Sequence, residues 1–250
     1  MNRVILLLFL AMPFTAFSQD LTALLHQATR LESEFREEEA LPVYQGVLRL
    51  QPHNVVALCK CSDLSCRIGN RQTNREKKID YFKAGYAYAQ AAWSVDSADA
   101  EVNIVMAFSL ARMALIQSGK EKVAAAGEIR RYAENATKLD PRNYKGYHIL
   151  GRWNYEVSGL NFIERTIARW FFGTLPDASL DDAIGYYEKS KALNPGFMLN
   201  YYELARAYRR AGKKEEAIRL LRQMDTLKDG MYDDREVRKE GRALLNDLED

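Results

Sequence analysis

Four segments of this chain repeat one spacing of small, aromatic and apolar residues, and they stop at Pro52, Ser97, Pro141 and Pro195. Counting back from these stops, the shared positions are Tyr44, Ala89, Ala133 and Tyr187 at eight residues, Val47, Ala92, Ala136 and Ser190 at five, and Leu50, Val95, Leu139 and Leu193 at two. Positions three apart lie on one face of a helix, and proline cannot continue one. Each segment therefore predicts a helix with one packed stripe.

A second helical pattern accompanies these segments. After the last stop, one helical face carries Tyr201, Leu204, Ala205 and Tyr208, and beyond a turn at Gly212 another carries Ala217, Leu221 and Met224. The first unit has the same pattern in Leu24, Ala28, Leu31, Ala40, Tyr44 and Pro52. This spacing resembles the tetratricopeptide repeat, in which paired helices stack along the chain. The resemblance implies an all-α fold, a tetratricopeptide-like right-handed superhelix of helical hairpins.

We expect one helical-repeat domain over residues 19–250. Its units are predicted at 21–54, 55–98, 99–143, 144–197 and 198–231, with a C-terminal capping helix at 232–250 that covers the open end of the stack. The stops lie 45, 44 and 54 residues apart, which exceeds the period of about 34 residues in the tetratricopeptide repeat. We place the extra length in turns at 69–76 and 118–122 and in an inserted helix at 160–173, before a helix that starts at Ser179 with a capping box.

The stretch from Leu150 to Pro195 carries a narrower resemblance. Its motif residues are Gly151, Arg152 and Trp153, then Phe172, Gly173 and Pro176, then Ala183, Tyr186 and Tyr187. In these residues the chain resembles the regulator of microtubule dynamics family, with weaker similarity from about residue 55 to 225. The resemblance implies a helical, tetratricopeptide-like fold. Eukaryotic members of that family are associated with microtubules, spindle poles and mitochondria, and the resemblance names no ligand for this chain.

The N-terminus predicts export. Arg3 precedes an almost wholly apolar run from Val4 to Phe17, and the small residues Ala16 and Ser18 stand at the −3 and −1 positions of a signal-peptidase site. The run is shorter than the roughly 20 residues needed to span a bilayer. We predict a signal peptide over residues 1–18 and a secreted or periplasmic protein without stable membrane insertion. An uncleaved anchor is the alternative.

Charge and cysteine content argue against several functional classes. The 36 Lys and Arg residues nearly balance 34 Asp and Glu residues, whereas nucleic-acid binders are usually far more basic. The spacing of Cys59, Cys61 and Cys66 matches no standard zinc site, so we predict buried free cysteines and no metal. No nucleophile motif or phosphate-binding loop occurs, and we expect neither an enzyme nor a cofactor. The charged turn Arg36–Glu39 is interpreted as solvated.

Helical-repeat proteins bind partners on a concave face, which the first helix of each unit lines. The residues expected there in the last two units are Lys145, His148, Arg152, Tyr155, Tyr202, Arg206, Arg209 and Arg210. Arg152, Arg206 and Arg209 are expected to converge, and arginine forks bind carboxylates. The leading hypothesis is an exported scaffold or adaptor that holds an acidic peptide or partner protein in this groove. Ordinary solvated arginine is the alternative.

The inserted aromatic segment offers a second candidate surface, formed by Ile163, Ile167, Trp170 and Phe171. This helix either packs back onto the stack or presents an apolar edge to a partner or a membrane. The edge suggests the alternative function, a structural scaffold that assembles with itself through apolar surfaces.

Overall fold

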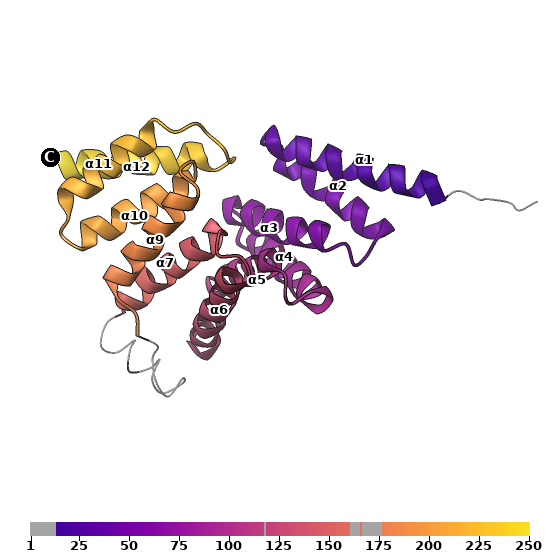
Figure 1. The fold of residues 1–250 in the computed structure, drawn as a ribbon, viewed down its shortest axis with the longest axis horizontal. Coiled ribbons are helices and arrows are strands. Elements are labelled where there is room, and N and C mark those ends of the chain that lie inside the picture. The colour runs from indigo at the N-terminus through magenta and orange to yellow at the C-terminus, as the bar shows by residue number, and fades with distance from the viewer. Residues whose placement is uncertain (1–13, 118, 161–165, 167–176) are drawn as a thin grey trace, which may run out of the picture.

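The fold is described from a computed structural model, which covers residues 14–117, 119–160, 166 and 177–250 (Figure 1). The helices are α1 (Phe14–Ser33), α2 (Glu37–Leu50), α3 (Val55–Arg71), α4 (Arg75–Val95), α5 (Ala100–Ala114), α6 (Gly119–Leu139), α7 (Tyr144–Ser158), α9 (Leu180–Leu193), α10 (Met198–Arg210), α11 (Lys214–Asp225) and α12 (Asp234–Glu249). Over these ranges all regular structure is helical, which confirms the predicted fold class. None of the helices in the same ranges is long and apolar enough to cross a bilayer.

The helices pair in chain order into hairpins. Helix α1 packs on α2, α3 on α4, α5 on α6, α7 on α9 and α10 on α11, while α12 packs on α10 and α11 at the end of the stack. These pairs follow the predicted order of units, and α12 stands where the capping helix is expected. The first helices of successive units also touch, α3 with α5, α5 with α7 and α7 with α10. The surface that α3, α5, α7 and α10 turn toward the axis of the stack is termed the inner face.

Polar residues determine where many of these helices begin. A side-chain oxygen of each cap accepts a hydrogen bond of 2.9 to 3.1 Å from a first-turn N–H, at Asn54, Asn74, Asp99, Asn143 and Ser179. Such caps satisfy N–H groups that have no partner within the helix. The helix start predicted at Ser179 is confirmed. Asn54, Asp99 and Asn143 each stand two residues after a repeat stop, so the cap is part of the repeat.

Two details of the predicted repeat are wrong. The expected turns at 69–76 and 118–122 are mostly helical, because α3 runs to Arg71, α4 begins at Arg75 and α6 begins at Gly119. Much of the extra length lies in long helices, with 21 residues each in α4 and α6. In addition, Leu50, Val95 and Leu139 are exposed rather than packed, since each is the last residue of its helix.

Small residues allow the helices of a unit to approach closely. Ala183 on α9 and Ala217 on α11 are fully buried at equivalent positions of two units. On α7, a Cβ added at Gly151 would lie 2.7 Å from the Tyr187 ring of α9. That distance is too short for any side chain, so the glycine of the Gly-Arg-Trp motif is required for the packing of α7 on α9.

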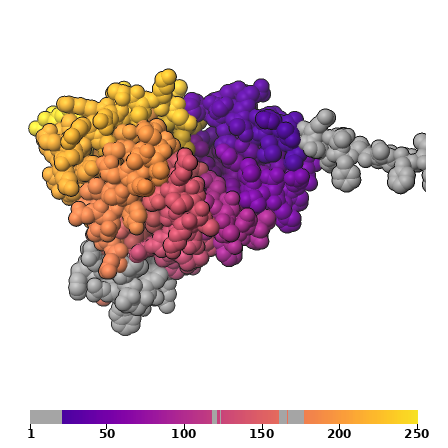
Figure 2. Space-filling model, viewed as in Figure 1, coloured from indigo at the N-terminus to yellow at the C-terminus, as the bar shows by residue number. Residues whose placement is uncertain are grey.

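The two ends of the stack meet. The α11–α12 loop, residues 226–233, lies against the C-terminal end of α3, where Arg71 Nη1 is 3.2 Å from Asp233 Oδ1. The Arg71 guanidinium also lies 4.2 Å from the centroid of the Tyr232 ring. Figure 2 shows the C-terminal atoms, in yellow, reaching the N-terminal atoms, in indigo and purple. The stack is therefore curved enough that residues 162 positions apart contact each other.

Candidate functional site

Predicted groove residues of α7 and α10 meet around a glutamate that the sequence analysis missed. Glu203 is buried on α10, and its two oxygens accept hydrogen bonds from Arg152 Nη1 at 2.7 Å and from Arg206 Nη1 at 3.0 Å. Arg152 Nη2 lies 3.5 Å from Glu156 Oε1. The register of the repeat brings Arg152 and Arg206 together as expected, but a carboxylate of the fold joins them. Arg152, Glu203 and Arg206 are termed the C-terminal cluster.

The ring of Tyr155 packs against Arg206 of this cluster and against the neighbouring Arg210. The guanidinium carbons of Arg206 and Arg210 lie 5.2 and 5.0 Å from the centroid of its ring. Arg210 Nη1 also donates a 2.6 Å hydrogen bond to the Tyr155 carbonyl, and Arg206 lies 5.8 Å from the ring of Tyr202. Cation–π contacts of this kind hold a guanidinium against an aromatic face. Tyr155 and Tyr202, both expected in the groove, therefore lie beside the arginines.

Two other predicted groove residues are paired within the fold. Lys145 Nζ donates to Glu101 Oε1 of α5 at 2.5 Å. Arg209 Nη2 lies 3.2 Å from Asp247 Oδ2 of α12. Because the capping helix covers that side of α10, Arg209 does not converge with Arg152 and Arg206.

His148, also expected in the groove, lies in the core. It is buried against the rings of Tyr187 and Phe197, and burial lowers its pKa. Asn200 Nδ2 donates to the Tyr187 carbonyl at 2.9 Å, which leaves Asn200 Oδ1 to accept from His148 Nδ1 at 3.0 Å. The histidine therefore links α7 to α10 as a neutral donor and is not available to a partner on the surface.

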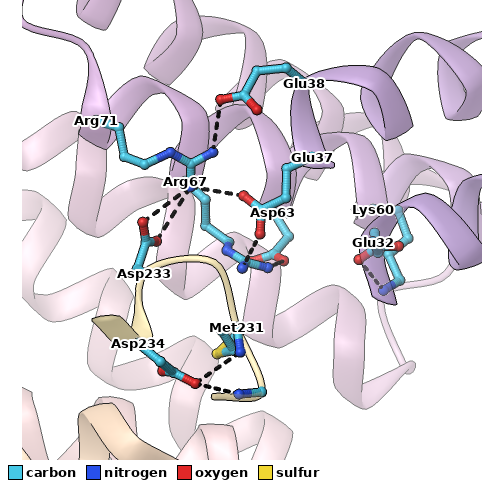
Figure 3. A network of polar contacts seen from close by, with 11 residues as sticks. Glu32, Glu37, Glu38, Lys60, Asp63, Arg67, Arg71, Met231, Asp233 and Asp234 are labelled. Carbon is cyan, nitrogen blue, oxygen red and sulfur yellow. Dashed lines mark hydrogen bonds and ion pairs between the residues drawn. The ribbon is translucent and has the colours of Figure 1, made fainter. Parts of the chain in front are cut away.

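A second buried glutamate lies near the other end of the stack (Figure 3). Glu37 of α2 forms ion pairs with Arg67 and, at 2.8 Å, with Arg71 Nη1. Burial raises the pKa of Glu37, while the two guanidinium groups oppose this effect. Arg71 also reaches Glu38 and Asp233, each at 3.2 Å. Glu37, Arg67, Arg71 and Asp233 are termed the N-terminal cluster, and its glutamate is buried rather than solvated as predicted.

The loop that carries Asp233 is shaped by the next residue. Asp234 is buried, and its Oδ2 accepts hydrogen bonds from the backbone N–H groups of Gly230 at 2.7 Å and Met231 at 2.8 Å. These bonds hold the turn in which Asp233 faces Arg71 (Figure 3). Sequence reasoning had no signal for this contact, because repeat spacing predicts neighbours within and between adjacent units only.

The cysteines are buried on α3 as free thiols, which confirms that prediction. Burial raises the pKa of Cys59, Cys61 and Cys66 to about 12, so all three are protonated at neutral pH. Thiolates, not thiols, act as metal ligands and nucleophiles. In the described part of the chain, no group of three or more His, Cys, Asp or Glu residues is placed to hold a metal ion.

Other surfaces contribute less to a candidate site. The predicted edge of Ile163, Ile167, Trp170 and Phe171 lies outside the described residues. Shallow depressions occur on α11, beside Ile218 and Arg222, and between α2 and α4, beside Leu48 and Tyr88. Neither depression brings together charges from several helices, so the inner face is the candidate binding surface.

Comparison with known proteins is consistent with this architecture. A thermophilic tetratricopeptide-repeat protein of Thermus thermophilus superposes with a TM-score of 0.65 at 13% identity, covering 90% of this chain and 99% of that structure. Regulator of microtubule dynamics protein 3 of Mus musculus is 27% identical over 174 residues, and protein 1 of Homo sapiens is 25% identical over 177. The alignments cover 69% and 70% of this chain but only 36% and 56% of those relatives.

The family model described as regulator of microtubule dynamics protein 1-3 matches residues 24–249. This match begins after the predicted cleavage site, within α1, and continues through the stack into the capping helix α12. The chain therefore belongs to the regulator of microtubule dynamics family, as the motif around Gly151 indicates, and folds as a tetratricopeptide-like helical stack.

Proposed function

We propose that this protein is an interaction scaffold whose inner face binds an acidic segment of a partner protein beside the C-terminal cluster. The observation that carries the proposal is the charge around Tyr155. Arg152 and Arg206 pair with the carboxylates of Glu156 and Glu203. Arg210 lies over the Tyr155 ring and has no ion pair with the described residues. One positive charge is left over, and Arg152 and Arg206 keep part of their surface exposed.

Such a strip suits a carboxylate-bearing segment. Charge-assisted hydrogen bonds from guanidinium groups contribute about 1.5–3 kcal/mol each. The glutamates and Tyr155 already hold the arginines in place, so little side-chain entropy remains to be lost on binding. The proposal is for a binding protein rather than an enzyme. It does not include the action on microtubules that the names of the relatives state, because the chain covers only part of those proteins.

Two arginines of α10 provide a matched test. Arg206→Gln and Arg209→Gln each remove one guanidinium that pairs with a carboxylate, but only Arg206 faces Tyr155. We expect Arg206→Gln to weaken binding of a fluorescein-labelled hexaglutamate peptide at least tenfold in fluorescence anisotropy, and Arg209→Gln to leave it unchanged. A hexaglutamine peptide is the control for charge. Equal affinities of both variants for hexaglutamate would contradict the proposed surface.

We propose further that the protein is exported through a signal peptide at residues 1–18. The family match starts at residue 24, beyond this segment, which supports its being dispensable for the fold. Residues 1–13 lie outside the described part of the chain, and residues 14–18 form the start of α1. N-terminal sequencing of protein from the envelope fraction should give Gln19 first, whereas intact Met1 in the membrane would contradict cleavage.

Self-assembly through apolar surfaces is the second candidate function, and one observation favours it. Leu50, Val95 and Leu139 are exposed at the ends of α2, α4 and α6, so one apolar residue recurs at the same edge of three successive units. A row of this kind can contact another copy. Light scattering during size-exclusion chromatography would show a mass that rises with concentration and persists at high salt. A constant monomer mass would rule this function out.

A further inference from the structure

Most cations of the inner face are neutralised by carboxylates of the fold itself, and Arg210 instead donates a hydrogen bond to the Tyr155 carbonyl. Each of these residues has a carboxylate oxygen within 4.0 Å: Arg67, Arg71, Lys145, Arg152 and Arg206. Arg112, in the last turn of α5, is different. No carboxylate of the described residues lies within ion-pair distance of its guanidinium, although α5 stands between α3 and α7 in the middle of the stack.

The contacts of Arg112 hold the side chain without neutralising it. Its Nη1 donates a 3.2 Å hydrogen bond to Asn70 Oδ1, and this bond is open to solvent. The guanidinium lies 4.8 Å from the centroid of the Phe108 ring, one turn back on α5. Its Nε is buried and has no acceptor in the described part of the chain. The side chain is therefore held by Asn70 and Phe108 and remains partly exposed.

The surroundings make this charge costly in the free protein. Burial lowers the pKa of Arg112, and the nearby Arg152 guanidinium lowers it as well. Arginine nevertheless stays protonated in proteins, so the group cannot relieve the cost by losing its proton. Asp233 and Asp63 act in the opposite direction, but Asp63 pairs with Arg67 and Asp233 with Arg71. A guanidinium charge that is removed from water and has no counter-charge favours the binding of an anion.

We infer that Arg112 is the anchor that receives a single carboxylate of the bound segment, either an acidic side chain or a C-terminus. This inference rests on the proposed function and extends the site from the C-terminal cluster to the middle of the inner face. One uncompensated guanidinium matches one carboxylate. A phosphate would bring about two negative charges at neutral pH, and the neighbouring cations that could share them are already paired. The exposed Asn70 amide can donate a further hydrogen bond, because only its oxygen is used by Arg112.

Arg112→Gln separates a binding role from a structural one. It removes the charge and the stacking on Phe108 but keeps a side-chain amide near Asn70. We expect at least a tenfold loss of hexaglutamate binding, together with an unchanged or higher thermal midpoint, because an uncompensated charge is removed from the fold. A lower midpoint with unchanged binding would show that Arg112 is structural and overturn the inference. Arg112→Lys should recover part of the affinity through its charge.

A second measurement does not depend on the peptide. Excess sodium acetate, compared with sodium chloride at equal ionic strength, should raise the thermal midpoint of the wild-type chain and not that of Arg112→Gln, since a ligand that binds only the native state stabilises it. If hexaglutamate fails to bind but acetate still raises the midpoint through Arg112, the proposed binding of an acidic segment is contradicted and the carboxylate site at Arg112 is supported. If hexaglutamate binding requires Arg206 but not Arg112, the proposed function is supported and the role of Arg112 as its anchor is contradicted. A larger shift with inorganic phosphate than with acetate would overturn the choice of carboxylate.

Discussion

The N-terminal and C-terminal clusters use the same arrangement, one buried glutamate between two arginines, in different settings. In the N-terminal cluster the side chains of Arg67 and Arg71 are 12% and 17% exposed. In the C-terminal cluster those of Arg152 and Arg206 are 48% and 33% exposed. Ion pairs that are enclosed by protein stabilise the fold, whereas arginines that keep contact with water remain available to bind a partner. Exposure of the arginines, rather than the presence of the pair, therefore separates a structural cluster from a candidate binding cluster.

Removing each glutamate's charge tests this difference with the largest expected effect. Glu37→Gln leaves two buried guanidinium groups without their main counter-charge, and we expect a loss of about 3–5 kcal/mol in the free energy of unfolding. Glu203→Gln leaves two arginines that water can solvate, and we expect a loss of about 1–2 kcal/mol. Urea unfolding followed by circular dichroism measures both.

The controls for this pair are exposed glutamates that contact the same arginines. Glu38→Gln removes a carboxylate from Arg71, and Glu156→Gln removes one from Arg152. Both carboxylates are more than half exposed, so each loss should stay below about 1 kcal/mol. Equal destabilisation by Glu37→Gln and Glu203→Gln would show that burial of the arginines does not distinguish the clusters.

The sequence predicts the C-terminal cluster in part and the N-terminal cluster not at all, for a physical reason. Arg152 and Arg206 hold equivalent positions in adjacent units, so the repeat spacing places them side by side. The sequence did not indicate the role of Glu203, because a carboxylate three residues before an arginine is common on solvated helices. The Arg71–Asp233 contact depends on the curvature of the whole stack, which accumulates from small rotations between units that residue spacing does not encode.

The same limit explains the misplaced residues. His148 occupies a register position that faces the groove in an ideal repeat, but here Asn200 and the rings of Tyr187 and Phe197 enclose it. Arg209 turns toward α12, since the last unit packs against a capping helix instead of another repeat. Spacing thus predicted the hairpins and their order well, while the contacts of particular side chains depended on neighbours outside the pattern.

Mild acid should destabilise the contact that His148 of α7 makes with Asn200 of α10. Burial lowers the pKa of His148 below its usual value of 6.5 in the folded state. The unfolded chain therefore binds this proton more readily, and stability is lost as the pH falls below about 6.5, by at most about 1.4 kcal/mol per pH unit.

The measurement compares urea unfolding at pH 7.5 and 5.5 for the wild type and for His148→Gln, which keeps a donor for Asn200. We expect a smaller change with pH in the variant, even if the variant is less stable overall. An identical change in both proteins would show that other groups are responsible for the acid sensitivity in this range.

The smallest expected effect on stability concerns the contact that joins the two ends of the stack. Asp233→Asn should lower the free energy of unfolding by no more than about 1 kcal/mol, because Asp233 is partly exposed and Arg71 keeps Glu37 and Glu38. The effect on shape should be larger. Spin labels at Thr73→Cys and Lys239→Cys report the distance between the end of α3 and α12, and the native cysteines are buried and protonated, so they react little with the label.

We expect a broader distance distribution in Asp233→Asn and none of this broadening in Asp247→Asn, which removes an equally long but more exposed ion pair, with Arg209, inside the C-terminal unit. An unchanged distribution in Asp233→Asn would mean that the stacking of Arg71 on Tyr232 is sufficient to hold the ends together. A broadened distribution in Asp233→Asn would show that the N-terminal cluster holds α2 and α3 together firmly but joins the two ends of the stack only weakly. The width of the inner face could then change at little cost in stability when a partner binds, because the N-terminal cluster would keep Glu37, Arg67 and Arg71 together after Asp233 has left.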